Sequence, residues 1–206
     1  RGTLCLDETP KERQFYGMEH RLRLRSLLLE RSLVMGNFTL SSGVRSSYYV
    51  DCRKTTMSAE GQFLVGQVAF QALREREPAV CWVGGLTLGA DPVAYAIAQR
   101  SWMEGDPVEA FTIRKQTKTH GTGQRIEGGL PSGVSVMVVE DTLTSGKSAL
   151  QAIKVLEDHK DTVLGVLALV DRDAGGAEAI RAAGYPLITL FTAAELLQAS
   201  GRSVVE

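Results

Sequence analysis

Cysteine is scarce in this sequence. The chain has three cysteines, Cys5, Cys52 and Cys81, and no two of them form a Cys-x-x-Cys pair. An odd number of widely spaced cysteines argues against a disulfide framework and against a structural zinc site. The same scarcity favours a reducing compartment, so we expect a cytoplasmic protein.

Long apolar runs are also missing. The nearest candidate for a membrane or targeting segment is the stretch 21–35, RLRLRSLLLERSLVM, which Glu30 and Arg31 interrupt. A membrane-spanning helix needs about 20 predominantly apolar residues, and this stretch falls short. Its leucines recur at helical spacing, which predicts a packed amphipathic helix over roughly 15–35 and no membrane partner.

Neither sign of charge is in excess. The 23 Lys and Arg residues nearly cancel the 24 Asp and Glu residues, which leaves a net charge of −1. A protein that binds nucleic acid usually carries a basic surplus, so we expect no nucleic-acid partner and any basic site must be local. The 206 residues, 44% of them hydrophobic, suffice for one domain with a sizeable core.

Apolar runs alternate with helical patterns from residue 59 onwards. Runs such as VMVV and VLALV lack polar alternation, which indicates strands covered on both faces. The alternation is typical of βαβ units and predicts a parallel, helix-covered α/β sheet. The segment 37–54, before this region, indicates two short strands beside the main sheet. The expected core strands are 79–85, 108–114, 134–141, 162–171 and 186–191, and the expected helices are 60–76, 89–103, 147–158, 176–183 and a last one begun by a Thr192–Glu195 capping box.

Three loops and one polar stretch are the places to look for a site. Ligands of parallel sheets bind at the carboxyl ends of the strands, which selects the loops after residues 84, 139 and 170. The polar stretch 115–133 is a further candidate, because long loops without regular structure are uncommon in compact domains and often functional.

The segment 138–148, VVEDTLTSGKS, carries the most specific chemistry. A buried strand ends in two adjacent carboxylates, Glu140 and Asp141, and a Thr/Ser/Gly loop then opens a helix. The free N–H groups of a first helical turn bind phosphate, and the loop hydroxyls add donors. The carboxylates suit ribose hydroxyls, or Mg²⁺ held through water. A P-loop is excluded, because its first glycine would fall at Asp141.

This segment resembles the motif with which type I phosphoribosyltransferases bind PRPP (phosphoribosyl pyrophosphate). The resemblance implies a parallel five-stranded α/β sheet flanked by helices in one domain, 1–206, with a hood at about 15–58 and a core at about 59–206. It implies Mg²⁺ held mainly through PRPP and water, with Glu140 and Asp141 as candidate ligands and Asp141 also catalytic. The implied PRPP-binding residues here are Glu140, Asp141, Thr142, Leu143, Thr144, Ser145, Gly146, Lys147 and Ser148.

A basic cluster opens the polar stretch. In RKQTKTHGTGQRIEG (114–128), Arg114, Lys115, Lys118 and His120 fall within seven residues, and glycines follow. A solvated hairpin is one interpretation. The other is a lid, because cations set against a leaving pyrophosphate act where charge develops, and a closing loop excludes water.

The spacing of this cluster is similar to the catalytic loop of orotate phosphoribosyltransferases. The resemblance implies that Arg114, Lys115, Lys118 and His120 bind the pyrophosphate of PRPP, with Lys118 and Arg114 catalytic and 115–133 a flexible lid. In that family the loop reaches into the active site of the partner subunit, so a homodimer with shared sites is implied.

Two further segments match the orotate-binding positions of the family. FTLSSGVRSSYYVDCRK (38–54) is similar to its N-terminal segment, which implies that Tyr49 and Val50 pack against the pyrimidine. Arg172 follows an expected core strand, and a guanidinium can grip the carboxylate of orotate bidentately. Thr144 matches the remaining orotate-contacting position.

Two positions depart from the pattern of some family members, which carry lysine where this chain has Ser41 and Leu88. The function that the motifs predict is transfer of the 5-phosphoribosyl group of PRPP to orotate, giving orotidine 5′-monophosphate and pyrophosphate, in pyrimidine biosynthesis. A phosphoribosyltransferase for another base and a PRPP-sensing, nucleic-acid-binding regulator are the alternatives.

Overall fold

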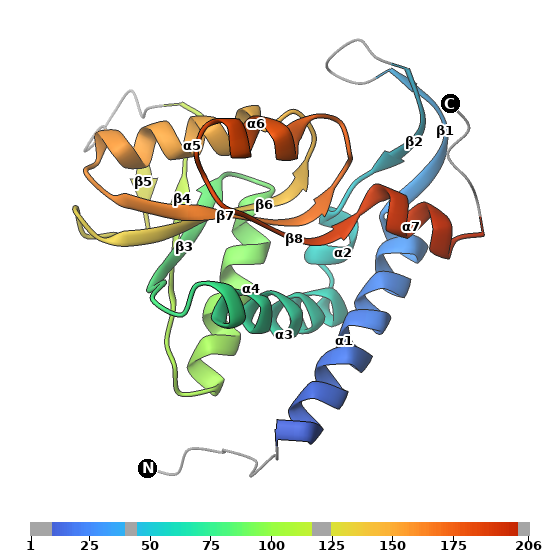
Figure 1. The fold of residues 1–206 in the computed structure, drawn as a ribbon, viewed down its shortest axis with the longest axis horizontal. Helices are drawn as coiled ribbons and strands as arrows, with labels where there is room; N and C mark the ends of the chain where they lie inside the picture. Colours follow the sequence, from blue (N-terminus) through green and yellow to red (C-terminus); the bar gives the residue numbers. More distant parts are fainter. Residues whose placement is uncertain (1–9, 40–44, 117–124, 202–206) are drawn as a thin grey trace.

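A six-stranded sheet forms the centre of the computed structural model, which describes residues 10–39, 45–116 and 125–201 (Figure 1). The strand order is β5-β4-β3-β6-β7-β8. Five of these strands are parallel, as expected: β3 (Trp82–Leu86), β4 (Glu109–Ile113), β6 (Ser135–Leu143), β7 (Thr162–Asp171) and β8 (Leu187–Thr192). The sixth, β5 (Ile126–Glu127), lies within the polar stretch 115–133 and pairs antiparallel with β4.

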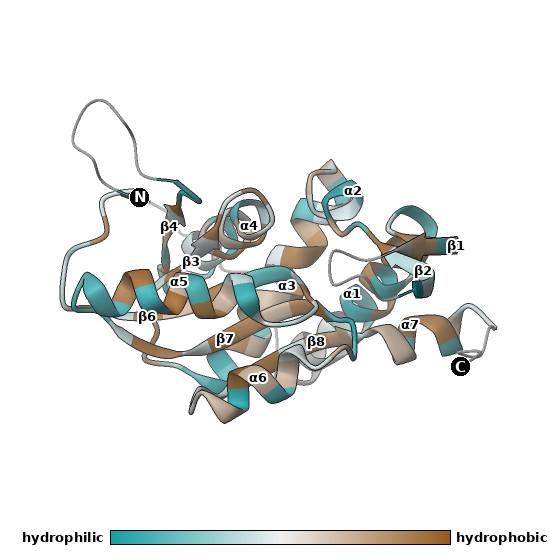
Figure 2. Cartoon of the chain, turned by 90° about the horizontal axis from the view of Figure 1, so that it is seen from above, coloured by the Kyte–Doolittle hydropathy of each residue, from teal (hydrophilic) through white to brown (hydrophobic). Residues whose placement is uncertain are grey.

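Helices cover both faces of this sheet, as Figures 1 and 2 show. Helices α3 (Ala59–Arg76) and α4 (Ala90–Met103) cover one face, and α5 (Lys147–Asp158) and α6 (Gly176–Ala182) cover the other. Along β6, Met137 and Val139 pack into the first apolar cluster, and Val136 and Val138 into the second. Because both faces are buried, successive residues are apolar, which is the pattern seen in the sequence.

A separate two-stranded sheet lies beside the core (Figure 1). Helix α1 (Pro10–Arg31) leads into β1 (Leu33–Thr39), which pairs antiparallel with β2 (Arg45–Val50), and the short helix α2 (Arg53–Thr56) follows. The predicted helix 15–35 is therefore wrong at both ends. It begins earlier, at Pro10, a residue suited to a first helical position. It ends earlier because the carbonyl of Ser32 accepts a hydrogen bond from Asp51 N at 3.0 Å, which draws the chain into pairing with β2. Ser41 lies outside the described residues.

The last helix, α7 (Ala193–Ala199), begins at half of the predicted capping box. Thr192 Oγ1 accepts from Glu195 N at 3.0 Å. The carboxylate of Glu195 instead accepts from Arg21 Nη2 at 3.2 Å, so it joins α7 to α1.

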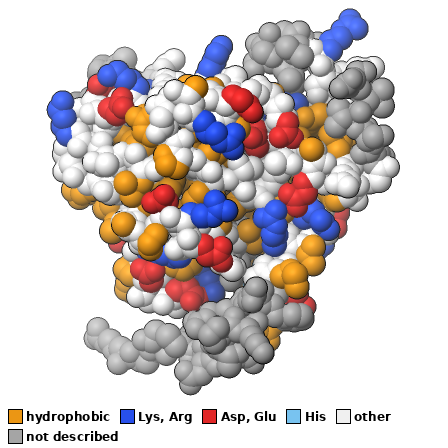
Figure 3. All heavy atoms as spheres, viewed as in Figure 1, with side chains coloured by type: hydrophobic (Ala, Val, Ile, Leu, Met, Phe, Trp, Pro, Cys, Tyr) orange, Lys and Arg blue, Asp and Glu red, His pale blue; other side chains and the backbone are white. Residues whose placement is uncertain are grey.

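The described surface carries mixed charge. On the face in Figure 3, basic and acidic side chains are interspersed, in line with the near-zero net charge. Across the described ranges, no helix is both long enough and apolar enough to cross a membrane.

Candidate active site

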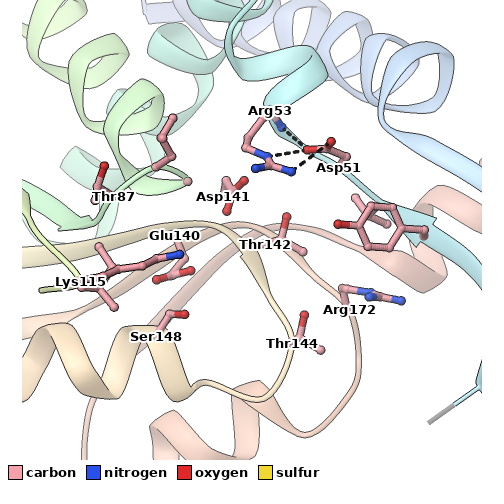
Figure 4. A pocket seen from close by; sticks show the side chains of 15 residues that line it. Asp51, Arg53, Thr87, Lys115, Glu140, Asp141, Thr142, Thr144, Ser148 and Arg172 are labelled. Atoms are coloured by element: carbon pink, nitrogen blue, oxygen red, sulfur yellow. Dashed lines mark hydrogen bonds and ion pairs between the residues drawn. The ribbon is translucent and has the colours of Figure 1, made fainter. Parts of the chain in front are cut away.

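A cavity of about 390 Å³ opens where the loops after β3, β6 and β7 meet the end of β2 (Figure 4). The expectation that ligands bind at the carboxyl ends of the strands directs attention to this place. Most of its walls are polar side chains. Its lining consists of Tyr49, Val50, Asp51, Arg53, Leu86, Thr87, Leu88, Gly89, Lys115, Glu140, Asp141, Thr142, Thr144, Ser148 and Arg172.

The two carboxylates of β6 lie on the floor of this cavity. Glu140 is 7% exposed, and its Oε1 has no hydrogen-bond partner among the described residues. Burial raises the pKa of Glu140 to about 8, the charge of Asp141 adds to the rise, and Lys115 opposes it. Burial also raises the pKa of Asp141, against the backbone N–H of Thr142 and the charge of Arg53. A buried acceptor without a partner suits a ligand that brings hydroxyl donors or a cation.

Strand β6 continues past the carboxylates to Leu143, beyond the expected end at 141, and a short loop then leads into α5. Thr142, Thr144 and Ser148 line the cavity. Gly146 is the N-cap of α5 with φ of 75°, in the left-handed region that favours glycine. Leu143 is 1% exposed and packs into the core beneath. Leu143, Ser145, Gly146 and Lys147 are absent from the cavity lining, so any role they have in binding phosphate would come through the main chain at the start of α5.

The loop after β3 forms a second wall of the cavity. Thr87, Leu88 and Gly89 line it, and the peptide bond between Thr87 and Leu88 is cis. Thr87 Oγ1 donates to Asp91 Oδ2 at 2.6 Å, and Thr112 Oγ1, from β4, donates to Asp91 Oδ1 at 2.9 Å. One carboxylate therefore ties this loop to the strand that leads into the basic cluster.

The basic cluster divides between two cavities. Lys115 lines the main cavity (Figure 4), whereas Arg114 Nε donates to Glu127 Oε1 at 2.8 Å. This pair lines a neighbouring cavity of about 350 Å³ beside α4. Lys118 and His120 lie outside the described residues. Of the four predicted pyrophosphate-binding residues, the structure thus places Lys115 against the carboxylates and holds Arg114 away from them.

The opposite end of the cavity holds the residues predicted to contact orotate. Arg172 is 5% exposed and donates from Nη2 to Tyr48 O at 3.3 Å and to Ser46 Oγ at 3.4 Å. Its guanidinium lies 5.1 Å from the centre of the Tyr48 ring and 5.9 Å from that of Tyr49. Its Nε has no hydrogen-bond partner among the described residues. A buried cation with an unfilled donor, flanked by aromatic rings, suits a flat anionic ligand.

Sequence reasoning missed two charged lining residues, Asp51 and Arg53. Arg53 Nε donates to Asp51 Oδ1 at 2.8 Å, directly after β2 ends. The signal was present in YYVDCRK, where an acid and a base two residues apart follow a strand. Only the fold shows that this strand end faces β6.

Metal ligands of the protein are few. Within the ranges that the structure describes, no group of three or more His, Cys, Asp or Glu side chains could hold a metal ion. Glu140 and Asp141 therefore offer at most part of a coordination shell, and the remaining oxygens would come from a ligand and from water.

Comparisons with known proteins identify the family. No protein-family model matches the chain. It is 45% identical over 183 residues to the orotate phosphoribosyltransferase of Aquifex aeolicus, covering 87% of this chain and 99% of the relative. For the orotate phosphoribosyltransferase of Mycobacterium avium, identity is 44%, covering 84% of this chain and 94% of the relative.

Solved structures agree with the sequence relatives. The crystal structure of Mycobacterium tuberculosis orotate phosphoribosyltransferase with Fe(III) dicitrate has a TM-score of 0.75 at 42% identity, covering 86% of this chain and 98% of that one. The complex of the Mycobacterium tuberculosis enzyme with PRPP has a TM-score of 0.70 at 35% identity, covering 86% and 92%. Identity at this level over nearly the whole length of each relative, together with the shared fold, shows that the chain belongs to the orotate phosphoribosyltransferase family.

Proposed function

We propose that the cavity between β2 and the carboxyl ends of β3, β6 and β7 is where this enzyme joins orotate to the 5-phosphoribosyl group of PRPP, in pyrimidine biosynthesis. The products are orotidine 5′-monophosphate and pyrophosphate. The observation that carries the proposal is the meeting of Glu140 and Asp141 with Arg172 in one cavity. The family assignment favours this reaction over transfer to another base and over a nucleic-acid-binding regulator.

PRPP occupies the β6 side of the cavity. Its 5′-phosphate accepts hydrogen bonds from Thr142, Thr144 and Ser148, which line this side, and from the free N–H groups at the start of α5. Its ribose hydroxyls donate to Glu140 and Asp141. The unpartnered Oε1 of Glu140 supports this placement, because a hydroxyl donor would satisfy a buried acceptor.

Orotate occupies the end formed by Arg172, Tyr49 and Val50. The guanidinium of Arg172 grips the orotate carboxylate, and Tyr49 supplies an apolar face for the pyrimidine ring. Thr144 lines the cavity near Arg172 (Figure 4), so we assign it contacts with both substrates. This arrangement points a ring nitrogen of orotate towards C1′ of PRPP.

Magnesium fits this site as a cofactor held mainly by PRPP and water. Two adjacent carboxylates, one with an unfilled oxygen, provide the hard oxygen ligands that Mg²⁺ prefers. Glu140 and Asp141 are the residues that would hold it. When bound, the ion supplies positive charge against the pyrophosphate oxygens.

Bond exchange occurs at C1′. The C1′–O bond to pyrophosphate breaks, its electron pair leaves with the pyrophosphate oxygen, and a bond forms between the orotate nitrogen and C1′. The carbon passes through an oxocarbenium-like state, which Asp141 faces from below. Lys118 and Arg114 neutralise the departing group, where charge develops. The attacking ring nitrogen of orotate also gives up its proton. We infer that this proton goes to solvent before the bond forms, because the acidity of orotate itself suffices without a general base from the protein.

The lid completes the site from a second subunit. We place the lid at 115–133, the hood at about 15–58 and the α/β core at about 59–206, within one domain that forms a homodimer. When the lid closes, Arg114 would leave Glu127 and bind pyrophosphate instead. Lys115, Lys118 and His120 would bind the same pyrophosphate group. The ion pair of Arg114 with Glu127 is partly exposed, which supports such an exchange.

Orotate consumption, followed by ultraviolet absorbance, tests the proposal. Wild-type protein with PRPP and Mg²⁺ is expected to consume orotate and to stop when EDTA removes the metal. Lys118→Ala is expected to slow turnover by about a hundredfold or more. Lys154→Ala, a lysine on the outer side of α5, provides the matched control with unchanged rate. Absence of orotate turnover in the folded wild-type protein would overturn the proposed reaction, and an unslowed Lys118→Ala would overturn the role of the lid.

A further inference from the structure

Arg53 occupies the wall of the cavity that faces the carboxylates. It is the first residue of α2, which Asp51 and Cys52 separate from the end of β2, and it lines the cavity. In Figure 4 its guanidinium lies over Asp141, whereas Lys115 and Ser148 lie on the opposite wall. Its charge acts on that carboxyl group, since it opposes the rise in the pKa of Asp141.

Asp51 holds this guanidinium in place. Arg53 Nε donates to Asp51 Oδ1 at 2.8 Å and Nη2 donates to Oδ2 at 3.3 Å, so one edge of the planar group is fixed. The second edge stays available, because Nη1 has no hydrogen-bond partner among the described residues. The side chain is 48% exposed. A guanidinium fixed on one edge with the other open to a cavity is preorganised to bind an oxyanion.

The basic side chains that line the cavity indicate where an oxyanion would bind. The basic side chains that line it are Arg53, Lys115 and Arg172. Arg172 lies at the end assigned to orotate, and Leu88 brings no charge from the loop after β3. Pyrophosphate carries several negative charges on two phosphate groups, and Lys115, the described lining cation nearest Ser148, meets it from one wall only. Arg53 is the remaining lining cation on the side of Asp141 and the Thr87–Gly89 loop.

We propose that Arg53 binds the pyrophosphate group of PRPP from the hood side, opposite Lys115. This role rests on the proposed function and adds a cation to it that belongs to neither the lid nor the phosphate loop. Arg53 grips pyrophosphate with Nη1 while Asp51 keeps its other edge fixed. The hood therefore contributes to PRPP binding as well as to orotate binding.

The rival role is structural, because an ion pair at the start of α2 could simply hold the helix. Exposed pairs of this kind contribute little to stability, and the two roles differ in what they do to ligands. Calorimetric titration of the full chain in Mg²⁺ separates them, with sodium pyrophosphate and ribose 5-phosphate as two probes. Only pyrophosphate reports on Arg53, whereas ribose 5-phosphate reports on the phosphate loop.

We expect Arg53→Ala to weaken pyrophosphate binding by about tenfold and to raise the KM for PRPP similarly. Ribose 5-phosphate affinity and the KM for orotate should stay within about twofold. Arg53→Lys should recover part of the lost pyrophosphate affinity, because lysine restores the charge but not the two parallel N–H donors of the guanidinium. Lys54→Ala, which removes the same charge one residue later and outside the cavity lining, should match the wild type.

Two results would overturn the role of Arg53. One is pyrophosphate affinity in Arg53→Ala that equals that of the wild type. The other is an equal loss of affinity for both probes, which would mean that the substitution deforms the cavity. Neither depends on turnover. A wild-type protein that binds pyrophosphate but leaves orotate unconsumed would count against the proposed function alone.

Discussion

Gly89 lies directly against the carboxylate of Asp141: a Cβ at this position would collide with Asp141 Oδ1. The loop after β3 can approach the acidic pair only because the residue has no side chain. The backbone of Gly89 has φ of −66°, which any residue can adopt, so the requirement is one of space.

Gly89→Ala is therefore expected to displace Asp141 and lower kcat/KM for PRPP by about tenfold, the scale of an overpacked contact. Steady-state kinetics measure this effect. Gly105→Ala is the control, because at φ of 72° it introduces backbone strain in the turn after α4, away from the cavity. Its melting temperature should fall with kcat/KM unchanged. Full activity in Gly89→Ala would show that Asp141 can shift without consequence.

The raised pKa of Glu140, about 8, predicts how stability depends on pH. A carboxyl group with a raised pKa binds its proton more tightly in the folded state, so its contribution is fully present below the unfolded value, 4.5. That contribution is lost as pH rises through about 8. Between these values, the free energy of unfolding should fall with pH more steeply in the wild type than in Glu140→Gln.

Urea denaturation of both proteins without ligand, from pH 5 to pH 9, measures the difference. Parallel stability profiles would mean that Glu140 titrates normally. The comparison reports on Glu140 together with its coupling to Asp141 and Lys115, because the remaining titrating groups are common to both proteins.

Arg172→Lys tests the bidentate grip on orotate. Lysine keeps the charge but cannot offer two parallel N–H donors, so the KM for orotate should rise by about tenfold or more. The KM for PRPP should change little, because Arg172 lies at the other end of the cavity. Arg181→Lys, on the exposed side of α6, is the matched control. Steady-state kinetics with each substrate varied in turn distinguish this result from a general loss of activity.

The proposed homodimer has a candidate contact face on α4. Tyr95, Trp102 and Met103 recur at helical spacing and are 51%, 77% and 53% exposed. Large apolar side chains exposed together often mark a protein interface, and Tyr95 adjoins the cavity that holds Arg114.

Trp102→Glu should shift the protein from dimer to monomer in light scattering and reduce turnover at low protein concentration. Gln151→Glu, which adds the same charge on the exposed side of α5, should leave the dimer intact. A Trp102→Glu protein that stays dimeric would show that the dimer interface lies on another face.

The order of core strands and helices follows from local pattern in the sequence. Continuous β-branched runs could be assigned to buried strands because both faces of the sheet are covered. The boundary between α1 and β1 could not be placed, because the apolar residues Leu33, Val34 and Met35 suit either a helix or a strand. A hydrogen bond from Asp51 N to Ser32 O, which extends the pairing of β1 with β2, decides it.

The acidic pair, the segment 142–148 and Arg172 could be predicted from the sequence as candidate site residues, because each lies at or just after the end of an expected core strand and belongs to a family motif. Their convergence depended on the parallel topology, which brings the strand ends to one edge. Three relationships came only from the tertiary structure: the pairing of Arg114 with Glu127, the position of Arg53 over Asp141, and the close approach of Gly89 to Asp141. Each relationship joins separate segments of the chain or depends on the direction of a side chain. Local sequence patterns predict neither the contacts between separate segments nor the directions of side chains.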